Sequence, residues 1–91
     1  GIVMTNACFD KSRLCKIARM AQNGLARSIR PVHTSADGDS VYAMSVGTVQ
    51  ADMDMVGTLA ADVMSEAILS AVKNAETAYG YISANDFLTE Y

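Results

Sequence analysis

The chain has 91 residues, of which 51% are hydrophobic, and its formal net charge is −3. A chain of this length forms one domain at most, so residues 1–91 are treated as a single unit, and the lack of a basic surplus excludes nucleic acid as an expected partner. The apolar content is larger than a small sphere can hide, which predicts a subunit or a fragment of a larger fold.

The first predicted elements are a short buried strand over residues 1–6 and an amphipathic helix that follows it. Asp10 supplies an N-cap, because its carboxylate can accept hydrogen bonds from the unpaired amides of a first helical turn. Apolar residues recur at helical spacing over residues 14–25 and form one face of that helix. Pro31 cannot continue the helix, which we expect to end near Ser28.

Two features of this helix bear on its surroundings. Gly24 weakens the helix by about 1 kcal/mol relative to Ala, yet the apolar pattern continues past it, which predicts close packing against a neighbour. Six of the seven basic residues lie between Lys11 and Arg30. We interpret these residues as a solvated helix face, with a surface for an anionic partner as the alternative.

Residues 40–46 predict a second strand, because their β-branched and aromatic side chains favour that state. Apolar residues occupy both alternating sets of positions, so we expect an inner strand that is covered on both faces. A second helix is predicted over about residues 55–78. Asp52 or Asp54 caps it, and it carries a broad apolar face that is rich in small residues.

The end of the chain completes a strand–helix–strand–helix order. Gly80 fits a C-terminal helix stop, and Ile82 and Phe87 are expected to anchor the tail over residues 81–91. The fold class is therefore α/β, but two strands and two long helices cannot close a core by themselves. We expect this βαβα piece to add to a larger sheet that another chain or another copy supplies.

Cysteine content and the lengths of the apolar runs set further expectations. Two cysteines do not make a disulfide framework and no signal peptide is visible, so a cytoplasmic location is the default. No apolar run approaches ~18 residues, so neither a membrane span nor a membrane partner is expected. The sequence has no Gly-rich phosphate loop, paired CxxC or HExxH motif, so no cofactor and no metal are expected.

The strongest candidates for chemistry are Asp37 and Asp39, which flank Gly38 just before the apolar run over residues 41–46. One interpretation is a turn, because Gly tolerates positive φ and Asp bonds its own backbone. The other is a carboxylate pair that orients or activates a nucleophile. A calcium loop is disfavoured, since the later ligands and the terminal Glu are missing.

Two other residues are weaker candidates. His33 could serve as a base, but a single loop His more often makes ordinary hydrogen bonds. Cys8 could serve as a nucleophile at a strand end. No nearby cation clearly activates it, so we favour a buried structural thiol.

Residues 15–47 resemble the DmpA-type aminopeptidase family, and most closely the branch that includes the nylon-oligomer (aminohexanoate-oligomer) hydrolase. The specific part of the match is the run Ile-Arg-Pro-Val-His-Thr at residues 29–34, the Asp-Gly-Asp at residues 37–39 and the strand at residues 41–45. The helix over residues 14–27 resembles the family's Leu-Ala…Gly-Leu-Ala-Arg pattern.

The resemblance implies an amide or peptide hydrolase whose precursor cleaves itself just before a Thr or Ser. The new N-terminal residue becomes the nucleophile, and its own α-amine serves as base. The small C-terminal chain carries this residue, and a large N-terminal chain completes a four-layer αββα sandwich, usually within a higher homo-oligomer. Asp37 and Asp39 match two Asp residues that lie beside the nucleophile in the nylon-hydrolase branch.

The chain departs from the family pattern at its first residue. Gly1 is neither Thr nor Ser, and the pattern places the nucleophile about three residues before it. The leading hypothesis is the small chain of such a hydrolase, with the nucleophile just upstream of Gly1. The alternatives are a nucleophile-free structural or binding subunit on the same fold, and a small α/β regulatory domain that associates with itself through the Ala-rich helix.

Overall fold

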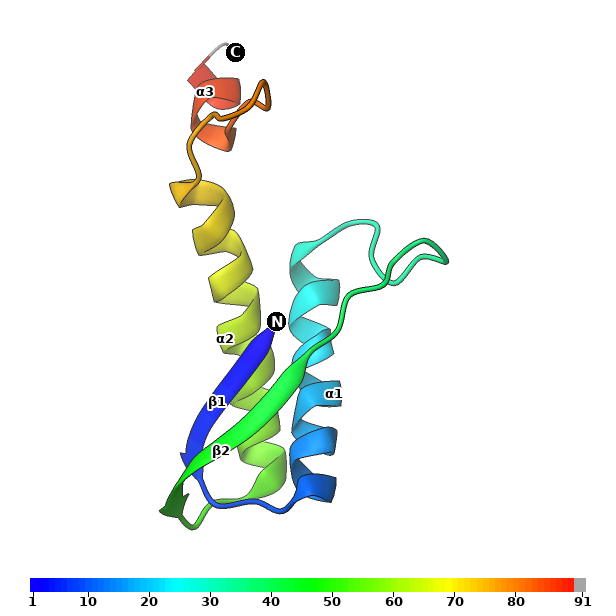
Figure 1. Ribbon diagram of the computed structural model, residues 1–91, viewed down its shortest axis with the longest axis vertical. Helices are drawn as coiled ribbons and strands as arrows, with labels where there is room; N and C mark the ends of the chain where they lie inside the picture. The colour runs from blue at the N-terminus through cyan, green and yellow to red at the C-terminus, as the bar shows by residue number, and fades with distance from the viewer. Residues whose placement is uncertain (90–91) are drawn as a thin grey trace.

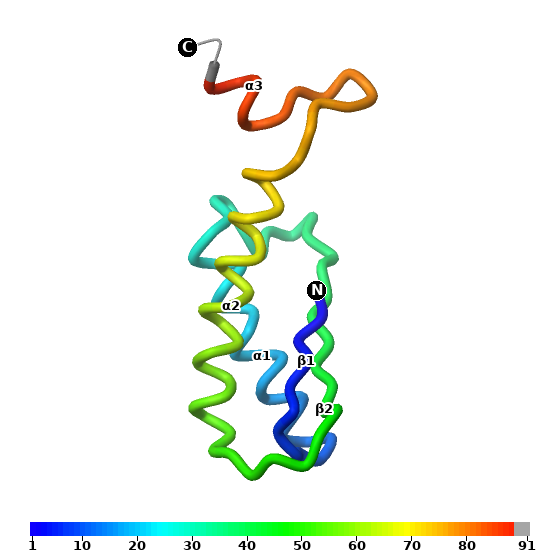
Figure 2. Tube along the Cα trace, turned by 90° about the vertical axis from the view of Figure 1, so that its left-hand side faces the viewer, coloured from blue at the N-terminus to red at the C-terminus, as the bar shows by residue number. Residues whose placement is uncertain are grey.

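The computed structural model describes residues 1–89 and has two layers (Figure 1). Its elements are, in chain order, β1 (Ile2–Ala7), α1 (Lys11–Ser28), β2 (Tyr42–Val49), α2 (Met53–Asn74) and α3 (Ala84–Thr89). The strands form one layer and the two long helices form the other, while α3 stands beyond the end of α2 (Figure 2). The predicted α/β class and element order are confirmed. The tail predicted to reach residue 91 extends outside the described residues.

The strands β1 and β2 pair in parallel, with Ile2 opposite Tyr42. The ladder includes Gly1, because the Gly1 amino group donates to the Ser40 carbonyl at 2.7 Å and the Tyr42 amide donates to the Gly1 carbonyl at 2.9 Å. This alternation is the parallel pattern, and it places Gly1 opposite Val41. Within residues 1–89 each strand has a neighbour on one side only.

Helices α1 and α2 run side by side in the same direction (Figure 1). Glycine permits their close approach at two points. A Cβ at Gly24 would lie 2.7 Å from the Cβ of Met64, and a Cβ at Gly57 would meet the sulfur of Met20. Since real Cβ atoms do not come that close, the close packing predicted at Gly24 is confirmed.

The core lies between the helices and the inner face of the sheet. Its most buried apolar side chains are Ile17, Ala21, Ala60 and Met64. Both helices begin at predicted N-caps, because Asp10 accepts from the Arg13 amide at 2.9 Å and Asp52 accepts from the Met55 amide at 3.0 Å. Helix α1 also ends where Pro31 predicts, at Ser28.

The outer face of the sheet has no cover within residues 1–89. Its exposed side chains are Ile2, Met4, Tyr42, Met44 and Val46. Within residues 1–89 the helices cover the second strand on one face only. A cover on its other face, which the sequence predicts, stays a prediction that depends on another chain or copy. On the inner side, a groove with a cavity volume of about 350 Å³ runs between β1 and α2, and its lining is mainly apolar.

The C-terminal part differs most from the sequence expectations. Helix α2 ends at Asn74 and not near residue 78, because Ala75 leaves the helical conformation. Gly80 does not stop the helix, since it lies at φ +83° in a separate turn. The predicted anchors also fail within this chain, because Ile82 and Phe87 remain about half exposed, at 50% and 48%.

Helix α2 also corrects the expectation about apolar runs. By length and composition alone, its 22 residues could cross a membrane. Core helices that are mostly buried pass the same test, whereas 22% of this window is buried here, with Ala60 and Met64 in the core. Most of this apolar window is therefore uncovered within residues 1–89.

Candidate functional site

The candidate site is the loop that joins α1 to β2. Its first half is a tight turn held by two reciprocal hydrogen bonds: the Thr34 amide donates to Oδ2 of Asp37 at 3.2 Å, and the Asp37 amide donates to the Thr34 carbonyl at 3.0 Å. His33, just before the turn, has a positive φ of 57°. The carboxylate of Asp37 thus fixes the local backbone, as the turn interpretation predicts.

Asp39 differs from Asp37 in its contacts. Its side chain is exposed, and it makes no hydrogen bond or ion pair with any other residue from 1 to 89. The segment from Asp37 to Ser40 contains neither helix nor turn and leads directly into β2. The carboxylate of Asp39 is therefore available to a group that this segment does not contain.

Both carboxylates line the same hollow, which has a cavity volume of about 400 Å³. Gln22 of α1 and His33 of the loop face the same space. The loop folds back along the last turns of α1, and this path brings residues from two separate parts of the sequence together. Gln22 is not recognisable as a candidate from the sequence, because nothing in the helical pattern distinguishes it from other polar helix residues.

The start of β1 lies beside this loop. The Gly1 amino group bonds to the carbonyl of Ser40, the residue after Asp39. Since β1 and β2 are parallel, the ends at which both strands begin lie together (Figure 1). Any chain that preceded Gly1 would begin its path next to Asp39.

The other candidates do not join this site. Cys8 follows the opposite end of β1, and its exposed thiol shows that the predicted buried structural role is wrong. The reason is that the chain turns away from the sheet after Ala7 to begin α1. Across residues 1–89, no three His, Cys, Asp or Glu side chains come close enough to hold a metal ion.

Comparisons with known proteins give a consistent picture. The model of peptidase family S58 matches residues 1–85. An uncharacterized aminopeptidase of Mycobacterium leprae is 37% identical over 88% of this chain, and one of Mycobacterium tuberculosis is 33% identical over 94%. A 6-aminohexanoate-oligomer endohydrolase of a Kocuria species is 26% identical over 78%.

These matches involve only part of each relative. They cover 26%, 29% and 24% of the three relatives, respectively, so the chain spans about a quarter of their length. No solved structure matches the chain.

Proposed function

The chain belongs to peptidase family S58, and we propose that it is the small chain of a self-cleaved hydrolase that cuts linear amides or peptides. The membership agrees with the resemblance of residues 29–34 and 37–39 to the DmpA-type aminopeptidases. The names of the relatives, aminopeptidase and 6-aminohexanoate-oligomer endohydrolase, support amide hydrolysis as the reaction class. The nucleophile would be a Thr or Ser about three residues before Gly1.

One observation carries this proposal: the register of the parallel ladder. Gly1 lies opposite Val41, so each residue before Gly1 would lie opposite a residue one position earlier in the loop. A residue three positions before Gly1 would then lie opposite Gly38, with Asp37 and Asp39 on either side. This register supports the proposal, because it would put the backbone of the nucleophile beside the loop that carries Asp37 and Asp39.

Amide hydrolysis of this kind needs one N-terminal residue, which supplies both the nucleophile and the base, and side chains that hold it in position. The hydroxyl oxygen attacks the amide carbonyl while its proton passes to the free α-amine of the same residue. That proton then goes to the departing amine, which leaves an ester between the substrate acyl group and the enzyme. A water molecule then hydrolyses the ester, which releases the substrate acyl group as a carboxylic acid and restores the hydroxyl of the nucleophile.

The two carboxylates would have different parts in this reaction. Asp37, already committed to the turn at Thr34, would hold the loop in place. Asp39 would accept hydrogen bonds from the N-terminal ammonium or hydroxyl and so fix the direction of attack. Both effects depend on position, which is why the rigid pairing of β1 with β2 matters for catalysis.

The remaining groups would come from a large chain of the same precursor. The uncovered outer sheet face and the apolar groove between β1 and α2 support such a partner, because exposed apolar surface of this extent usually marks an interface. A sheet layer on the outer face and a helix layer beyond it would complete a four-layer αββα sandwich. Several such two-chain units would form the higher homo-oligomer.

The first test is intact-mass spectrometry of the full-length protein under denaturing conditions. We expect two chains, the smaller beginning with Thr or Ser a few residues before Gly1. Replacing that residue with Ala should leave a single uncleaved chain without amidase activity. A native protein that is a single uncleaved chain would contradict the proposal and leave a structural or binding subunit as the alternative.

A further inference from the structure

The face of α1 that points away from the sheet is basic. Lys16, Arg19 and Arg27 recur at helical spacing, and all three side chains are exposed. Helix α1 contains no acidic residue between its first and last positions. The result is a positive stripe along the length of α1.

The charged side chains on the neighbouring face of α2 are acidic, up to Glu66. Asp54, Asp62 and Glu66 follow one another at spacings of eight and four residues, and all are exposed. The exposed apolar side chains of Met55 and Leu59 lie at helical spacing with Asp62 and Glu66 and share that side of the helix.

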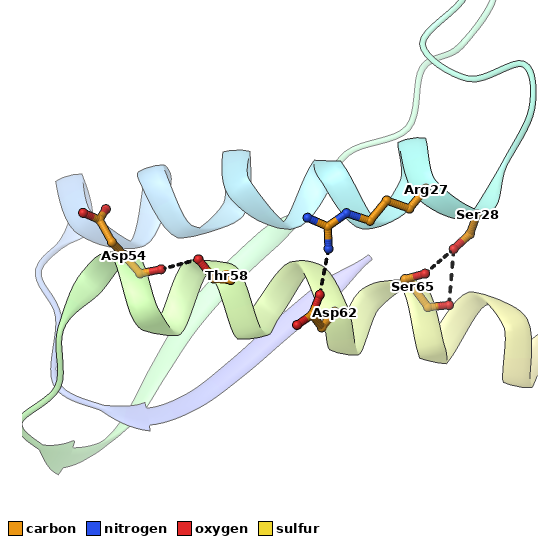
Figure 3. Close-up of polar contacts among 6 residues, drawn as sticks. All are labelled: Arg27, Ser28, Asp54, Thr58, Asp62 and Ser65. Atoms are coloured by element: carbon orange, nitrogen blue, oxygen red, sulfur yellow. Dashed lines mark hydrogen bonds and ion pairs between the residues drawn. The ribbon is translucent and has the colours of Figure 1, made fainter.

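The contact between α1 and α2, where Gly24 faces Ala61, is here called the seam. The two stripes adjoin there, because Nη1 of Arg27 and Oδ1 of Asp62 form an ion pair at 2.7 Å across it (Figure 3). The helical layer therefore has a positive half and a negative half, side by side.

Most of these charges have no ion-pair partner within residues 1–89. The Arg27–Asp62 pair is the one ion pair found among residues 1–89. Lys16 and Arg19 on one side, and Asp54 and Glu66 on the other, are left for interactions outside it.

The two stripes are also matched along the helix axes. Helices α1 and α2 are parallel, and facing residues differ by 37 in number, as in the contact between Ser28 and Ser65. Gly24 faces Ala61 with the same offset. Positions on one helix can therefore be assigned a level on the other.

By this register, acids and bases stand at the same levels. Asp54 lies at the level of Lys16 and Arg19, and Glu66 lies just beyond the level of Arg27. A second copy turned by a twofold axis along the helices would place its acidic half over this basic half without any shift along the axes. A twofold axis perpendicular to the helices, in the plane of the contact, would instead place basic residues opposite basic residues and acidic residues opposite acidic ones.

We propose that this outward face of α1 and α2 is an isologous contact with a second copy of the protein. The charge halves select both the partner and the direction of the axis, because they complement each other in one orientation only. The proposal does not depend on the hydrolase activity proposed above.

The expected size of the contact sets its strength. An 18-residue helix is about 27 Å long and two packed helices present a face about 20 Å wide, which gives roughly 500 Å² per copy. This is less than the ≈ 800 Å² per partner of a standard interface. The contact should therefore be sensitive to salt and act together with other interfaces in the assembly.

The test uses the full-length protein and two charge-reversed variants. One is Lys16→Glu/Arg19→Glu on α1, and the other is Asp54→Lys/Glu66→Lys on α2. Both leave the Arg27–Asp62 pair intact. The matched control is Lys73→Glu, which reverses an exposed charge on α2 past the end of α1. Molar mass is measured by light scattering after gel filtration, at about 0.1 M and about 1 M salt.

We expect each double variant alone to have about half the molar mass of the wild type at low salt, because one isologous contact is lost. Mixing the two variants should restore the wild-type mass, since each then meets opposite charges. The control should keep the wild-type mass, and high salt should lower the mass of the wild type.

Three results would overturn the proposal. They are a wild-type mass of one copy, double variants that keep the wild-type mass, and a mixture that stays at the reduced mass. The mixing step separates a true contact from a folding defect, because a misfolded variant would not be rescued by its counterpart.

Discussion

The seam between α1 and α2 and the loop between α1 and β2 constrain their residues very differently. A Cβ at Gly24 in the seam would overlap the backbone of α2, whereas a Cβ at Gly38 in the loop would meet nothing within 4 Å. Every residue from His33 to Ser40 is exposed. The seam therefore determines stability, and the loop leaves its side chains free for chemistry, so mutations in the two regions should affect different properties.

The largest effect is expected from Gly24→Ala in the seam. Alanine normally favours a helix by about 1 kcal/mol over glycine. Here its Cβ would lie 2.5 Å from the Ala61 carbonyl oxygen, so the helices must separate. We expect the free energy of unfolding to fall by about 2–3 kcal/mol in denaturant titrations of the full-length protein.

Gly38→Ala is the matched control for that substitution. With open space around the position, it should change the free energy of unfolding by less than about 0.5 kcal/mol. Equal losses at Gly24 and Gly38 would show that the seam and the loop do not differ as described.

The second largest effect is expected on activity, from a substitution in the loop between α1 and β2. Asp39→Asn removes a charge that has no partner within residues 1–89, so stability should not change. We expect kcat for amide hydrolysis to fall by about 10²-fold, the cost of a reacting group that is no longer held in position. Steady-state kinetics and a thermal melt on the same sample measure both.

Asp37→Ala gives the contrast to Asp39→Asn. It removes the acceptor of the Thr34 amide, so both activity and stability should fall, the latter by about 1 kcal/mol. If Asp39→Asn kept the wild-type kcat, the assignment of that carboxylate to the site would be wrong.

The smallest effect is expected at a helix start. Asp52→Ala removes the side-chain acceptor of the Met55 amide and should lower the free energy of unfolding by about 1 kcal/mol. Asp52→Asn, which keeps a capping oxygen, should recover most of that loss. Activity at saturating substrate should stay unchanged in both, since α2 begins at the end of β2 away from the loop. A fall in kcat for either Asp52 variant would contradict this separation.

Local features of the fold were predictable from the sequence because short-range physics decides them. Asp10 and Asp52 cap helices through bonds to amides three residues away, and Pro31 ends α1 because of its own ring. The close approach at Gly24 followed from a glycine in an otherwise apolar face.

The errors concern longer-range features. The apolar residues on both faces of β2 suggested two covering layers, but a pattern cannot say whether the second layer belongs to the same chain. Asp37 and Asp39 are recognisable in the sequence as a motif. Gln22 lines the same cavity only because the loop lies beside α1, which the local pattern does not predict. The extra helix α3 and the exposed Ile82 and Phe87 depend on tertiary context that local pattern does not contain.

The open edge of β1 has a consequence for how this protein must be made. An unpaired strand edge beside exposed apolar side chains is a template for aggregation, so the chain produced alone should precipitate or require a chaperone. The precursor proposed above would avoid this hazard if it folded before it was cut. While both parts shared one backbone, their effective concentration would be in the millimolar range, and the larger part would cover the edge before it met another molecule. In that proposal, folding first and cleavage second would protect the yield of the protein as well as create its nucleophile.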